Sequence, residues 1–207
     1  MRVTIEIEQD EDCESPRECD NLGTMVCWHK RYTLGDVQPK ESPEEWLEHL
    51  AQEFDTKGRL EYWEGESINA GWTATGDKAD EQYQKAVEQI LEREVIMLPV
   101  FLYDHSGITM STTSFSCPWD SGQVGYIFVT TENVRKEFSW KRMSTKRRVL
   151  VKALLTAEVE EYDTYLRGDV FGYTIHDDTD EILDSCCGFY GLDAVKEAVI
   201  NALKRTL

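Results

Sequence analysis

The sequence has 207 residues, of which 40 are acidic and 22 are basic, so its formal net charge is -18. Hydrophobic residues make up 41% of the chain and aromatic residues 11%, a composition that can bury a core and excludes an intrinsically disordered chain. No linker rich in Pro, Gly or Ser divides the sequence, and its length suits one hydrophobic core. We therefore predict a single domain over residues 1–207.

The amino terminus reads MRVTIEIE, an alternation typical of a strand, and it lacks the apolar stretch of a secretory signal. The longest apolar run, residues 95–103, is much shorter than the roughly 18 residues that cross a bilayer. These features predict a cytoplasmic protein that does not associate with membranes. Its six cysteines are then expected to be thiols, because disulfides are rare in a reducing compartment.

In the amino-terminal half, apolar periodicity and capping residues predict most of the elements. In chain order they are a strand at 2–8, an acidic loop, a strand at 24–29, a helix over 43–54 and a helix over about 77–94. The first helix has the clearest start, because Ser42 and Glu45 match the S-x-x-E capping box. The Gly-containing region 55–76 fits either a long excursion or a weak hairpin, and we leave both open.

The carboxyl-terminal half begins with three apolar or alternating segments that predict an antiparallel meander with polar turns. The predicted elements are strands at 95–103, 108–113 and 124–130, a helix over 145–166, a hairpin of 169–176 with 181–187, and a helix over 192–207. Taken together, the elements predict an α+β fold in which an antiparallel sheet or meander packs with three to four helices.

Reactive side chains concentrate in the turns between residues 104 and 123. The candidates for catalysis there, with two from elsewhere in the chain, are His29, Asp104, His105, Cys117, Asp120 and Glu158. Such groups are compatible with a Cys/His hydrolytic site or a carboxylate–His metal site. However, turns need Asp and Ser for conformational reasons alone, and no familiar catalytic motif is present. We interpret the region as turn chemistry, expect no metal or cofactor, and keep an enzyme as the alternative.

Glu158 interrupts the apolar stripe of the predicted 145–166 helix, between Leu155 and Tyr162. A carboxylate on a buried stripe must find a partner or shift its pKa. We expect it to be buried and satisfied by an Arg, a Tyr or a backbone donor. A role in acid–base or metal chemistry is the alternative.

Two charged segments are interpreted as solvated surface. The acidic segment 177–181 lacks the central Gly of a calcium-binding loop, so we expect a hairpin tip. The segment 135–152 has eight bases and one acid around Trp140. It is suited to contact phosphate, but the negative total charge favours a solvated face.

Acidic residues dominate the first part of the chain: residues 1–100 carry 24 acids and 10 bases, and residues 101–207 carry 16 and 12. Such a field repels nucleic acid and attracts basic proteins. We therefore expect no direct binding to nucleic acid. The carboxylates predicted to bind a basic partner are Glu6, Glu8, Asp10, Glu11, Asp12, Glu14, Glu18, Asp20, Glu44, Glu45, Glu48, Asp80, Glu81 and Glu88.

Three segments resemble a known group of proteins. They are DNLGTMVCWH at 20–29, LPVFLYDHSGITM at 98–110 and CPWDSGQVG at 117–125. The group consists of functionally unassigned proteins encoded by bacteriophages and mobile elements, and the resemblance covers most of the chain. The Cys186–Cys187 pair departs from it, since a Trp is expected at the second position. The resemblance implies a phage origin and no particular reaction.

Our leading hypothesis is a phage-encoded, non-catalytic inhibitor in the host bacterial cytosol. By analogy with other acidic phage proteins, it would bind a basic, nucleic-acid-handling defence protein, as anti-CRISPR or anti-restriction proteins do, with its carboxylates as a DNA mimic. One alternative is an enzyme or metal-binding protein with a site in the 104–123 turns. Another is an accessory protein of phage replication or of the virion. The sequence predicts no oligomeric state.

Overall fold

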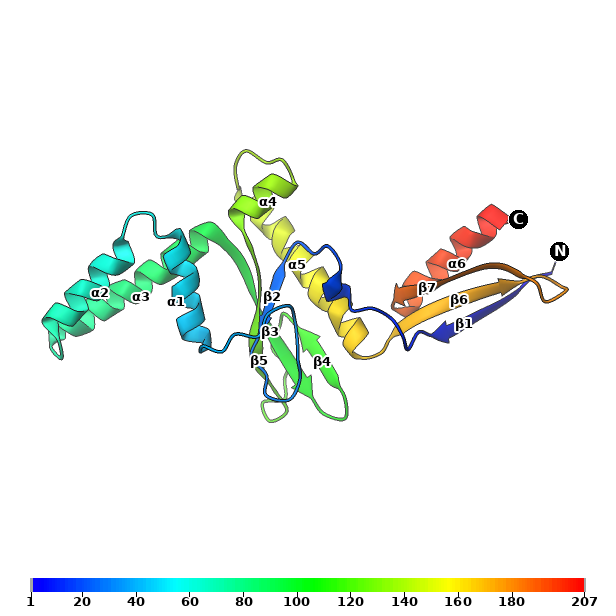
Figure 1. Cartoon of the computed structure of the whole chain (residues 1–207), viewed down its shortest axis with the longest axis horizontal. Coiled ribbons are helices and arrows are strands. Elements are labelled where there is room, and N and C mark those ends of the chain that lie inside the picture. The colour runs from blue at the N-terminus through cyan, green and yellow to red at the C-terminus, as the bar shows by residue number, and fades with distance from the viewer. Residues whose placement is uncertain (1, 207) are drawn as a thin grey trace. The chain divides into compact units, whose positions relative to one another are not determined.

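The computed structural model describes residues 2–206 and has an α+β fold (Figure 1). Within these residues, the strands are β1 (Thr4–Gln9), β2 (Thr24–Cys27), β3 (Val95–Asp104), β4 (Ile108–Ser111), β5 (Ser121–Thr130), β6 (Val170–His176) and β7 (Ile182–Tyr190). The α-helices are α1 (Pro43–Phe54), α2 (Arg59–Ala70), α3 (Ala74–Glu94), α4 (Thr131–Glu137), α5 (Thr145–Leu166) and α6 (Leu192–Thr206). A short 3-10 helix, η1, spans Pro16–Glu18.

Two compact units divide the chain. Unit 1 comprises Met1–Asn21, Val100–Gln123 and Thr156–Leu207, and unit 2 comprises Leu22–Pro99 and Val124–Leu155. The strands form a three-stranded sheet of order β1-β6-β7 and a four-stranded sheet of order β2-β5-β3-β4. The boundary between the units falls within β3, β5 and α5 rather than in a linker. The prediction of a single domain over 1–207 stays a prediction.

The three-stranded sheet belongs to unit 1 and joins the first strand to the carboxyl-terminal hairpin (Figure 1). β1 runs antiparallel to β6. Helix α6 packs against both β6 and β7. Its buried residues form a core with the sheet, made of Tyr173, Ile175, Val195, Val199 and Ala202. The periodicity that predicted an amphipathic helix over 192–207 is thus confirmed for the described part of that range.

β1 alternates Ile and Glu, and its pairing decides which face each side chain takes. Ile5 lies opposite Ile175 in β6, a residue of the core beneath α6. Glu6 and Glu8 therefore point to the opposite face of the sheet. All six residues of β1 are exposed, as expected for an edge strand.

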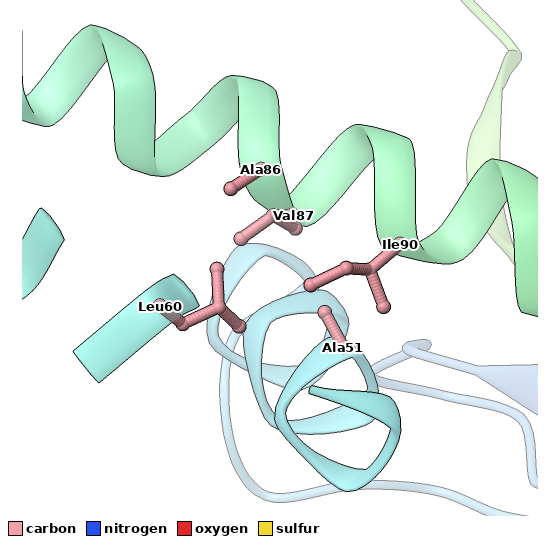
Figure 2. Close-up of a cluster of buried hydrophobic side chains, with 5 residues drawn as sticks. All are labelled: Ala51, Leu60, Ala86, Val87 and Ile90. Atoms are coloured by element: carbon pink, nitrogen blue, oxygen red, sulfur yellow. The ribbon is translucent and has the colours of Figure 1, made fainter. Parts of the chain in front are cut away.

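In unit 2, α1 and α2 pack against α3. Figure 2 shows the side chains that meet there, which are Ala51, Leu60, Ala86, Val87 and Ile90. Helix α1 starts with the predicted capping box: Ser42 Oγ accepts from the Glu45 amide at 3.2 Å, and the Glu45 carboxylate accepts from the Ser42 amide at 2.9 Å. These hydrogen bonds hold the pKa of Glu45 below its usual value.

Three helices depart from the sequence prediction. Region 55–76, left as an excursion or a hairpin, contains α2, which begins after Gly58 without a side-chain cap and carries Gly65 in its middle. The sequence pattern of α2 is weakly helical because glycine disfavours a helix interior. The burial of Leu60 against α3 stabilises the helix in spite of Gly65. Helix α4 lies within the stretch after β5 for which we predicted no element. Helix α3 begins at Ala74 with Thr73 as its N-cap, rather than at Asp77.

We predict that Gly125→Ala lowers the free energy of unfolding by about 3 kcal/mol, because overpacking of a tight site is destabilising. The midpoint of urea unfolding should fall accordingly. A Cβ at Gly125 would clash with the backbone carbonyl oxygen of Val26 in the paired strand β2. Gly122, in the same strand β5, faces open space and supplies the control. An unchanged midpoint for Gly125→Ala, with Gly122→Ala also neutral, would contradict the close β2–β5 approach.

Candidate functional site

The turn before β4 and the loop after it meet at one end of the four-stranded sheet, although the strands do not follow one another as in the predicted meander. β5 lies beside β3 and not beside β4, so the loop after β4 returns to the end of the sheet where β3 ends. The Asp104 amide donates to the Asp120 carbonyl at 2.8 Å, and the His105 amide donates to the Gly107 carbonyl at 3.0 Å. Ser106 takes a left-handed backbone conformation with φ of 60°. The reactive residues of 104–123 are therefore drawn into one cluster by turn geometry.

Asp120 is the centre of this cluster. Its Oδ2 lies 3.3 Å from His105 Nδ1 and accepts from the Cys117 thiol at 3.6 Å. The His105 side chain is 63% exposed. The Ser121 hydroxyl donates to the Cys117 carbonyl, so it serves the turn. Three of the six catalytic candidates are thus neighbours, with the backbone of Asp104 beside them.

The order of these groups does not suit nucleophilic catalysis. In a Cys/His site the imidazole takes the thiol proton, and a carboxylate orients the imidazole from its far side. Here the Cys117 thiol donates to Asp120 Oδ2, the same oxygen that contacts the His105 ring. The thiol proton is therefore directed to a carboxylate rather than to the imidazole. The geometry favours the interpretation as turn chemistry.

The remaining candidates have other partners. His29 belongs to unit 2, where its Nδ1 accepts from the Tyr32 amide at 3.1 Å and its ring stacks on that of Tyr32. Glu158 pairs with Arg17, as described below. Across residues 2–206, no group of three or more His, Cys, Asp and Glu side chains is arranged to hold a metal ion.

Glu158 is half-buried on α5, beside the buried residues Leu155 and Val159, so the expectation of burial holds in part. Its Oε2 lies 3.1 Å from Arg17 Nη1, and the two side chains are 15% and 5% exposed. Arg17 sits in η1, which is capped by Ser15, in the middle of the acidic amino-terminal loop. The carboxylate is therefore satisfied by an arginine, which favours the structural role. Arg17 itself was missed from the sequence, because 141 residues separate the partners.

The acidic hairpin between β6 and β7 is closed by one aspartate. Asp177 Oδ1 accepts from the Thr179 amide at 2.8 Å, from the Thr179 hydroxyl and from the Glu181 amide at 2.9 Å. These hydrogen bonds lower the pKa of Asp177. The oxygen that a calcium site would need is already used to form the turn, as expected for a hairpin tip.

The carboxylates predicted to bind a partner are divided between the units. The eight from Glu6 to Asp20 belong to unit 1, and the six on α1 and α3 belong to unit 2. In unit 1, seven of the eight are exposed. In unit 2, several have local partners: Glu45 caps α1, Glu81 pairs with Lys85, and Asp80 accepts from Ser67. The eight in unit 1 are therefore the better candidates for recognition.

The acidity of the chain lies almost entirely in unit 1. That unit has 22 acidic and six basic residues, a net of -16, whereas unit 2 has 18 and 16, a net of -2. The comparison of residues 1–100 with residues 101–207 did not show this concentration of charge, because unit 1 also includes the acidic residues after 156. The carboxylates after residue 156 were not among the predicted binding residues. They belong to the same unit as the amino terminus because β1 pairs with β6.

Comparison with known protein families, curated proteins and solved structures finds no match. No helix within the described residues is long and apolar enough to cross a membrane. No disulfide joins any of the six cysteines, all of which lie in the described part of the chain. Function is therefore argued from the charges and contacts above.

We predict that Glu158→Ala lowers the free energy of unfolding by about 2 kcal/mol, since it removes a carboxylate partner from the Arg17 guanidinium, whose side chain is 5% exposed. Glu160→Ala, two residues away and exposed, is the matched control and should change stability by no more than about 0.5 kcal/mol. Urea unfolding of both variants measures the difference. Equal midpoints would show that the Arg17–Glu158 pair contributes nothing.

Proposed function

We propose that this protein is a phage-encoded, non-catalytic inhibitor that binds a basic, nucleic-acid-handling defence protein in the cytosol of the bacterial host. Unit 1 supplies the phosphate-like surface, as in anti-restriction or anti-CRISPR proteins that act as DNA mimics. The observation that carries the proposal is the net charge of -16 on unit 1. A field of this kind steers a basic partner and raises its association rate.

Most cations of unit 1 contact carboxylates of the same unit, which supports the proposal. Four of its six basic side chains contact carboxylates: Arg17 with Glu158, Arg167 with Asp163 and Asp169, Lys196 with Asp193, and Arg205 with Asp184. More than a dozen acids of the unit remain beyond these pairs. Its outward charge is therefore strongly negative.

The edge strand β1 offers regularly spaced carboxylates. Glu6 and Glu8 share one face and are about 7 Å apart along the strand, at roughly 3.4 Å per residue. The acidic loop that follows adds Glu11, Asp12 and Glu14, all exposed. A row of fixed negative charges is what a groove that binds a phosphate backbone recognises without reading sequence.

Unit 1 also contains an open cavity of about 480 Å³, lined by Glu160 and Glu161 of α5 and by Phe189 and Tyr190 of β7. Carboxylates beside aromatic rings suit the ammonium or guanidinium group of a lysine or arginine. The Tyr190 hydroxyl donates to the Glu14 carbonyl at 2.9 Å, which joins the cavity wall to the acidic loop. A basic side chain of the partner fits this position.

We predict that reversing two charges on β1, in Glu6→Lys/Glu8→Lys, reduces capture of the partner at least about tenfold, mainly by slowing association. The immobilised chain is exposed to those proteins of a host lysate that a heparin column retains, and bound proteins are identified by mass spectrometry. The matched control is Glu53→Lys/Glu61→Lys, at exposed positions of unit 2. Its capture should equal that of the unaltered chain.

Added duplex DNA should displace the captured protein, because both ligands compete for one groove. Higher salt should slow association, since exposed charges are screened beyond about 10 Å at 0.1 M salt. Capture that resists both DNA and the β1 reversal would contradict the mimic proposal. Loss of capture in the unit 2 control alone would move the binding surface to α1 and α2.

We predict that Cys117→Ala and His105→Ala leave capture and inhibition unchanged, because their contacts with Asp120 serve a turn. Inhibition is measured as survival of phage DNA in cells that carry the defence system. Loss of inhibition in both variants, with capture and thermal midpoint intact, would instead support the alternative of an enzyme in the 104–123 turns.

A further inference from the structure

A groove in unit 2 has no part in the proposed function. It has a volume of about 520 Å³. One wall is formed by the end of α3 and the start of β3, and the other by the first turns of α5. Its apolar lining includes Leu91, Ile96, Met97 and Val149. Val149 is 64% exposed. We call this feature the α5 groove.

Two cations line the α5 groove, and three more lie near its residue Thr145 in the sequence. Arg148 and Lys152 line it, and Lys141, Arg142 and Lys146 are exposed in the loop and the turn just before. The first turn of α5 contains no acid, although the positive end of a helix dipole normally favours acids and disfavours cations. An anionic ligand would relieve this unfavourable arrangement. One acid, Glu92, also belongs to the lining.

An apolar groove with cations in its lining fits a ligand that carries both apolar and acidic groups. Several contacts argue against nucleic acid as that ligand. The Trp140 ring stacks on Phe138 and is covered by the Arg147 guanidinium 4.5 Å from its centroid, so it is already engaged. Arg148 donates to the carbonyls of Val95 and Arg93, so it fixes the wall of the groove and leaves the recognition of charge to the lysines. Phosphate also has no use for the apolar lining.

We propose that the α5 groove binds an acidic, amphipathic segment of a protein partner. An apolar side chain of the segment enters beside Val149, and flanking carboxylates face Lys146 and its neighbouring cations. Helix-in-groove recognition combines apolar anchors with charged flanks in this way. The groove lies within unit 2, so this interaction is independent of the carboxylate surface on unit 1.

The test is fluorescence anisotropy of the full chain with a labelled helical peptide of about 16 residues, whose Leu and Phe anchors at helical spacing are flanked by Glu and Asp. We expect binding that weakens about tenfold in Val149→Asp and in Lys146→Glu. Lys78→Glu is the matched control: it makes the same charge change on α3, roughly 20 Å along the helix axis from Leu91. It should bind the peptide as the unaltered chain does.

Each remaining outcome decides against the proposal. A Glu/Ser peptide of the same charge that binds equally well would show that charge alone acts. A single-stranded oligonucleotide that binds more tightly than the peptide, and is lost in Lys146→Glu, would assign the surface to nucleic acid. Absence of peptide binding, with circular dichroism of the chain normal, would overturn it outright.

The variant Glu6→Lys/Glu8→Lys should bind the peptide as the unaltered chain does. Its binding would show that the α5 groove acts independently of the function proposed for unit 1.

Discussion

The ion pair between Arg17 and Glu158 is the contact on which the acidic surface depends. Arg17 is the single Lys or Arg between residues 3 and 28, a stretch that holds eight acids. A chain of such charge repels itself and resists ordering, yet Arg17 is 5% exposed and lies 3.1 Å from its partner on α5. One inward cation thus anchors a loop whose acids point outward.

The other anchors of this loop use its backbone and leave most of its carboxylates available. The Asp10 amide donates to the Val170 carbonyl at 2.8 Å, and the Glu14 carbonyl accepts from Tyr190. The Asp10 carboxylate is the exception, because it accepts from the Gly188 amide at 3.0 Å. A loop held in this way presents its charges in a fixed pattern, which lowers the entropy that a partner must overcome on binding.

How much could be predicted from the sequence depended on how local each signal was. The capping box of α1 and the span of α5 follow from neighbouring residues and were predicted closely. The helix α2 depends on the packing of Leu60 against α3, which outweighs a weak local pattern. The convergence of the turns around Asp120 depends on β5 lying beside β3, which the predicted meander did not include. The contacts of the Asp120 carboxylate with His105 and Cys117 depend on the same strand order. Arg17 and the concentration of charge in unit 1 depend on contacts across more than 140 residues, and no local pattern encodes them.

Hydrogen exchange of the complex with the captured partner would locate the binding surface without any substitution. If unit 1 supplies the surface, amides of residues 4–20 and of β7 should exchange more slowly in the complex, because a docked groove excludes water from the edge strand and the acidic loop. Amides of α1 to α3 should exchange as in the unbound chain. Slowed exchange confined to residues 43–94, with β1 and the acidic loop unchanged, would contradict the proposal that unit 1 binds the partner.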